Sequence, residues 1–144
     1  MLRVVGGSVR LRPMKAFVIG LVLGLLFILL VHTIPPQPAR QIIALVLAFT
    51  ACTYAGALLA QEATPPFALA ELLVALVVLA LSVVGLRAST TSLAAGYLLH
   101  GVWDLLHHPR GVPTRVVRWF PPACAAFDFV VAVALLIGPW RPMA

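Results

Sequence analysis

The stretch AFVIGLVLGLLFILLVH, residues 16–32, decides the fold, because it contains no Asp, Glu, Lys or Arg and is long enough to cross a bilayer as a helix. The whole chain of 144 residues is 62% hydrophobic and 10% charged, which is too apolar for a soluble domain of this size. We therefore predict one all-α domain over residues 1–144, a polytopic membrane bundle of about five spans. The apolar blocks place these spans at residues 15–33, 40–60, 66–87, 90–108 and 121–140.

Lys and Arg are distributed unequally between the two sides of this predicted bundle. Seven lie on one side: Arg3, Arg10, Arg12, Lys15, Arg110, Arg115 and Arg118. Three lie on the other: Arg40, Arg87 and Arg141. The positive-inside rule then predicts a cytoplasmic N-terminus in a multi-pass membrane protein. Because the cations sit at span ends, the net charge of +6 indicates contact with membrane lipids and no nucleic-acid partner.

The segment YLLHGVWDLLHH, residues 97–108, places ionisable side chains inside the predicted fourth span. At about 100° per residue, one side of this helix carries His100, Asp104, His107 and His108. Tyr97 extends the stripe by one turn. A lipid-facing Asp at mid-helix costs about 2.5–3.5 kcal/mol, so we expect the stripe to face the bundle interior.

Two other predicted spans carry an acid at a matching depth. Glu71 lies ~7 Å from the start of the third span, Asp128 lies ~9 Å along the fifth, and Asp104 lies ~6 Å from the end of the fourth. All three span ends are on the predicted cytoplasmic side, so the acids should share one layer. His32 lies at the opposite end of the first span, where we expect it to be an interfacial residue.

Imidazole nitrogen and carboxylate oxygen together suit zinc, iron or manganese. We predict a divalent-metal site near the cytoplasmic side, with ligands drawn from His100, Asp104, His107, His108, Glu71 and Asp128. In an enzyme built on this site, the metal would polarise a substrate oxygen or activate water or dioxygen, and the substrate would be a lipid-like small molecule. The candidate catalytic residues are Asp104, Glu71 and Tyr97.

Two further interpretations of the polar stripe stay open. Without a metal, it could transfer protons or bind an ionisable substrate, or it could be a structural polar network. Such a protein would be a non-enzymatic subunit of a larger membrane complex or a small transporter, and its polar stripe would relay protons or bind a cation. Five spans are few for a transport path, so this hypothesis favours a homo-oligomer. The chain lacks repeated H-x-x-H-H clusters, G-x-S-x-G, a P-loop and H-E-x-x-H, so no common enzyme template applies.

Two short patterns concern packing rather than chemistry. Cys52 and Cys124 lie in separate predicted spans without a C-x-x-C pair, so we expect neither a disulfide nor a thiolate zinc site. We interpret both as small buried apolar side chains. Gly20 and Gly24 form a G-x-x-x-G pattern in the first span, which permits close approach of another helix and which we interpret as a packing feature.

Several segments also carry a family resemblance. They are PARQ at 38–41, Glu71 followed by GLR at 85–87, LLHGVWDLLHH at 98–108, and Cys124 with Asp128. In this order they resemble the bacterial membrane family catalogued as domain of unknown function 6010, over residues 16–138. The family's H-x-x-W-D-x-x-H-H core maps to His100, Trp103, Asp104, His107 and His108. Phe127 stands where the family has a second cysteine, so a thiol pair is not implied. The resemblance implies a multi-pass membrane fold in a bacterial inner membrane and supports these residues, but it implies no reaction.

Overall fold

The computed structural model describes residues 13–61, 64–108 and 114–138. This part of the chain forms helices and turns without a strand, so the all-α prediction is confirmed. The five helices are α1 Pro13–His32, α2 Pro36–Leu58, α3 Pro65–Arg87, α4 Thr90–Leu106 and α5 Phe120–Ile137. Five of the cations used to predict the orientation lie outside the described residues: Arg3, Arg10, Arg12, Arg110 and Arg141.

Four of the helices have the length and composition of membrane spans. They are α1, α2, α3 and α5, and α4 is shorter, with 17 residues. Seventeen residues extend ~25 Å, which is less than the ~30 Å thickness of the hydrocarbon core. The predicted membrane-type helical bundle is therefore confirmed, with the polar stripe on its shortest helix and on the two residues that follow it.

Proline and serine mark where the helices begin. Pro36 and Pro65 occupy the first turns of α2 and α3, and Pro121 lies in the first turn of α5. These positions suit proline because the first N–H groups of a helix have no partner inside the helix. Helix α4 begins instead with a cap, in which the Ser89 hydroxyl accepts a hydrogen bond from the Thr91 N–H at 3.2 Å.

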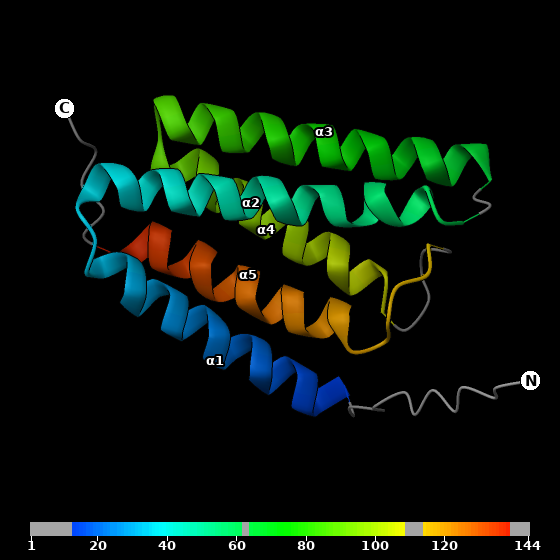
Figure 1. Cartoon of the computed structure of the whole chain (residues 1–144), viewed down its shortest axis with the longest axis horizontal. Helices are drawn as coiled ribbons and strands as arrows, with labels where there is room; N and C mark the ends of the chain where they lie inside the picture. The colour runs from blue at the N-terminus through cyan, green and yellow to red at the C-terminus, as the bar shows by residue number, and fades with distance from the viewer. Residues whose placement is uncertain (1–12, 62–63, 109–113, 139–144) are drawn as a thin grey trace, which may run out of the picture.

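Consecutive helices run in opposite directions, and α5 lies between α1 and α4 while α3 packs on α2 and α4 (Figure 1). The contact between α1 and α5 depends on two glycines. A Cβ atom at Gly20 would lie 2.0 Å from the Ala123 carbonyl oxygen, and one at Gly24 would lie 2.9 Å from Val130 Cβ. The G-x-x-x-G pattern therefore serves packing within the chain, as the sequence predicts.

The buried ionisable residues gather in one half of the bundle. The end of α1, the start of α4 and the end of α5 lie at one end of the bundle (Figure 1), and the apolar core includes Val31, Leu93 and Leu135 from these helix ends. The other half, near the C-terminal end of α4, holds five buried ionisable residues: Glu71, His100, Asp104, His107 and Asp128. The outward faces of α1 and α3 are apolar and exposed, as helices in contact with lipid require.

Candidate functional site

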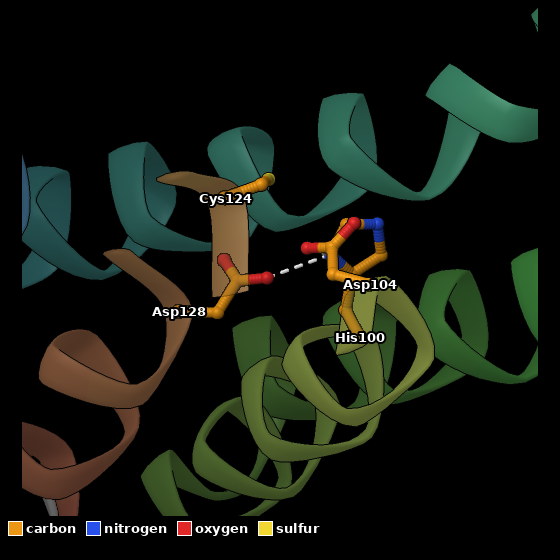
Figure 2. Close-up of side chains that lie close together, drawn as sticks. All are labelled: His100, Asp104, Cys124 and Asp128. Carbon is orange, nitrogen blue, oxygen red and sulfur yellow. Dashed lines mark hydrogen bonds and ion pairs between the residues drawn. The ribbon is translucent and has the colours of Figure 1, made fainter. Parts of the chain in front are cut away.

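Four side chains from two facing helices converge on one point in the polar half of the bundle. His100 and Asp104 lie one turn apart on α4, and Cys124 and Asp128 lie one turn apart on α5, so each helix presents its pair on one face. Figure 2 shows the four side chains gathered between the two helices. One potential ligand atom from each lies within 4.8 Å of all the others. This group, the His100 cluster, could hold a metal ion.

The hydrogen bonds of His100 define which of its nitrogens faces the cluster. Nε2 lies 3.0 Å from the backbone carbonyl oxygen of Thr50 on α2. A carbonyl oxygen only accepts, so Nε2 carries the proton and donates it. Nδ1 then points at the acids, 2.6 Å from Asp128 Oδ2 and 3.4 Å from Asp104 Oδ2. Metal-ligating histidines show the same arrangement, in which the second N–H is fixed by a carbonyl or carboxylate.

Two carboxylate oxygens of the His100 cluster lack a hydrogen-bond partner. Asp104 Oδ2 and Asp128 Oδ1 are buried without a hydrogen-bond partner in the described part of the chain, and Asp104 Oδ2 has only the 3.4 Å contact with His100 Nδ1. A buried polar atom without a partner costs about 1–3 kcal/mol, and more when it is charged. A cation bound between the two aspartates would remove this cost. The nitrogen, sulfur and two oxygen donors also fit zinc, which accepts this mixture at a tetrahedral site.

A second polar group, the Glu71 cluster, consists of Glu71, Trp103 and His107 and joins α3 to α4. Glu71 Oε2 accepts a hydrogen bond from the Trp103 indole N–H at 2.8 Å, and Oε1 lies 2.8 Å from His107 Nε2. His107 Nδ1 donates to the Trp103 carbonyl oxygen at 2.9 Å. Both Glu71 oxygens and both His107 nitrogens therefore have partners. The Glu71 cluster is closed on itself, in contrast to the His100 cluster.

Tyr54 on α2 connects the two clusters, and the sequence analysis missed it. Its ring stacks on His107 with centroids 3.9 Å apart, and its hydroxyl donates to Asp104 Oδ1. The depth argument applied to the acids could have found Tyr54, which lies a few residues before the end of α2 at the same end of the bundle. The Thr50 carbonyl could not have been found, because a backbone acceptor leaves no signal in the sequence.

The predicted ligands thus separate into three sets. His100, Asp104 and Asp128 come together, whereas Glu71 and His107 pair with each other. His108 lies partly exposed in the turn after α4, and it belongs to neither cluster.

Tyr97 and His32 lie outside both clusters as well. The hydroxyl of Tyr97 donates to the Ile43 carbonyl oxygen at 2.8 Å and is not directed at the acids. His32 is exposed at the far end of α1.

The interpretation of the cysteines as small buried apolar side chains is wrong for Cys52, whereas Cys124 lies among polar groups. Cys52 is exposed on the outward face of α2, because Ala51 and Tyr54 turn the opposite face inward. The Cys124 sulfur lies in the His100 cluster rather than in an apolar core. The signal for Cys124 was its four-residue spacing from Asp128, which matches the spacing of His100 and Asp104.

Fold and site together define a helical membrane-type protein with a buried group of His, Asp and Cys side chains. The chain belongs to a family described as a family of unknown function (DUF6010), whose sequence model matches residues 15–140. This match confirms the resemblance seen in the sequence. No curated protein and no solved structure matches the chain.

Proposed function

We propose that this protein binds one divalent transition-metal ion inside the membrane, at the His100 cluster. The observation that carries the proposal is the convergence of four donor atoms within 4.8 Å around two buried carboxylate oxygens that lack a hydrogen-bond partner. The ligands are Nδ1 of His100, Oδ2 of Asp104, Sγ of Cys124 and a carboxylate oxygen of Asp128. The nitrogen and sulfur donors favour zinc or iron over manganese, which prefers oxygen.

The number of ligands supports a structural metal site rather than a catalytic one. Catalytic zinc sites keep one position open for water or substrate, whereas sites closed by four protein ligands are structural. Here four donors are available, and the side chains of His100, Asp104 and Asp128 are almost fully buried. We therefore favour a site that retains its ion, in a stable membrane protein or in a subunit of a larger complex.

The basic residues support a cytoplasmic location for the end of the bundle that carries the site. Lys15 lies in the first turn of α1, and Arg115 and Arg118 precede α5, so these three cations lie at the same end. The opposite end has Arg40 and Arg87 among the described residues. With this orientation the ion would reach the site from the cytoplasmic side.

The proposal predicts one zinc or iron ion per chain. Elemental analysis of the purified protein in detergent, after removal of loosely bound metal by gel filtration, measures this ratio. The metal-depleted protein should recover one equivalent when Co²⁺ or Zn²⁺ is added alone. Protein that contains no metal and takes up none would contradict the proposal, and a proton-transfer or structural role for the acids would then be preferred.

Cobalt spectra test the assignment of Cys124. A thiolate bound to Co²⁺ gives an intense near-ultraviolet charge-transfer band, so the wild-type protein should show this band. Cys124→Ser should lose it and keep weaker visible bands, because the other three ligands remain. Cys52→Ser is the matched control and should leave the spectrum unchanged, since Cys52 is exposed on α2. A band that persists in Cys124→Ser would remove this cysteine from the ligand set.

An enzyme acting on a lipid-like substrate is a second candidate, favoured by an apolar hollow of about 400 Å³ between α1 and α5. Its wall begins at Phe129, the neighbour of Asp128 in the chain, and extends along α5 to Ile137, away from the His100 cluster. A bound ion would supply Lewis-acid activation, and Glu71 could exchange a proton at Oε1 with His107. The lining residues are Leu25, Ile28, Phe129, Val130, Val133, Ala134 and Ile137.

This second candidate requires the hollow to accept an acyl chain. Native mass spectrometry should then show a lipid retained by the wild-type protein and lost from Val133→Trp, which fills the hollow. Equal lipid retention by the two proteins would count against it.

A further inference from the structure

The Tyr54 side chain bridges the two clusters: its ring stacks on His107 of the Glu71 cluster, and its hydroxyl hydrogen-bonds to Asp104 of the His100 cluster. The hydroxyl donates to Oδ1 of Asp104, a candidate ligand, while Oδ2 of the same carboxylate has no hydrogen-bond partner. The two oxygens of Asp104 are therefore not equivalent. One is occupied by the phenol, and the other faces His100 Nδ1 at 3.4 Å.

We propose that Tyr54 is a positioning residue that fixes Asp104 as a one-oxygen ligand through Oδ2. This inference rests on the proposed metal site and adds how that site is kept in shape. A carboxylate can bind a cation through either oxygen or through both, and the choice changes the geometry around the ion. A hydrogen bond from a neighbouring side chain removes this freedom.

The Glu71 cluster holds Tyr54 in place. The Tyr54 side chain is buried, and its ring lies against the His107 imidazole at an interplanar angle of 21°. The imidazole cannot turn freely, because the Trp103 carbonyl oxygen and the Glu71 carboxylate contact its two nitrogens. Glu71 on α3 and Trp103 on α4 thus fix the His107 ring, and the His107 ring in turn positions Tyr54 on α2 against Asp104. Glu71 and His107 act on the ion through Tyr54, and they are not its ligands.

The test is a Co²⁺ titration of the metal-depleted protein followed by its visible spectrum, with Tyr54→Phe compared with wild type. Phenylalanine keeps the ring on His107 and removes only the hydroxyl. We expect Co²⁺ to bind about 10–100-fold more weakly, the usual range for partners that orient a ligand. The visible bands should also shift, because Asp104 is free to use its other oxygen.

Tyr97→Phe is the matched control. It removes the same hydroxyl from another buried tyrosine, whose hydrogen bond goes to the Ile43 carbonyl oxygen. It should leave the cobalt affinity and spectrum unchanged, even if it lowers the thermal stability.

The outcomes separate this inference from the proposed function. Wild-type protein that binds no cobalt would overturn both. One equivalent of cobalt in wild type with the same affinity and spectrum in Tyr54→Phe would leave the metal site in place and overturn the role of Tyr54. Lower thermal stability of Tyr54→Phe with an unchanged spectrum would also overturn it, since a merely structural tyrosine gives that result.

Discussion

His100→Ala is expected to abolish metal binding, with the largest effect of any single substitution in the His100 cluster. His100 is the one nitrogen donor of the cluster, and its Nδ1 contacts both aspartates. Its loss also opens a cavity between the helices and removes the group that contacts both carboxylates. We expect the affinity for Zn²⁺ to fall by more than about 100-fold, the upper end of the effect of residues that only orient a ligand.

His107→Ala is the informative control, because the sequence analysis assigned both histidines to one ligand set. The structure separates them, since His107 pairs with Glu71 while His100 faces the aspartates. Elemental analysis should therefore find one ion per chain in His107→Ala at saturating zinc and almost none in His100→Ala. Zinc titration should show a weaker effect for His107→Ala, which disturbs only the support of Tyr54.

The opposite pattern would revise the site. Metal lost from His107→Ala and retained by His100→Ala would move the ion to the Glu71 cluster. Loss from both variants would favour a single larger site that combines the two clusters.

The fold could be predicted from the sequence because it follows from the composition of the apolar segments. Apolar blocks of about 20 residues predict membrane-spanning helices, because a backbone exposed to lipid must satisfy its own hydrogen bonds. Depth along each helix could also be predicted, because the rise per residue is fixed. This is why Glu71, Asp104 and Asp128 were expected in one half of the bundle.

The direction in which each side chain points around its helix axis could not be predicted equally well. His107 and His108 are 100° apart around α4, and only the packing of α3 decides that His107 meets Glu71 while His108 remains partly exposed. The sulfur of Cys124 was overlooked for a different reason. Cysteine is one of the most frequently buried residue types, so its presence in an apolar segment does not distinguish a ligand from a packing residue.

Gly20→Leu is expected to prevent α1 from packing on α5, the largest effect predicted on stability. Even the first carbon of a side chain at this position would lie 2.0 Å from the Ala123 carbonyl oxygen, which belongs to the backbone and cannot move aside by a rotamer change. The two helices must then separate. Overpacking of a tight core typically costs 1–3 kcal/mol and sometimes more, and a backbone clash places this site at about 3 kcal/mol or above.

Thermal unfolding of the detergent-solubilised protein, followed by tryptophan fluorescence, measures this effect. Gly20→Ala should show the same direction with a smaller loss, because the clash already begins at Cβ. Gly56→Ala supplies the control, since a Cβ there meets no atom within 4 Å and alanine is favoured over glycine in a helix by about 1 kcal/mol. Opposite signs for Gly20→Ala and Gly56→Ala would establish close helix approach, rather than glycine flexibility, as the role of Gly20. A neutral Gly20→Ala would mean that α1 does not approach α5 as closely as the structure shows.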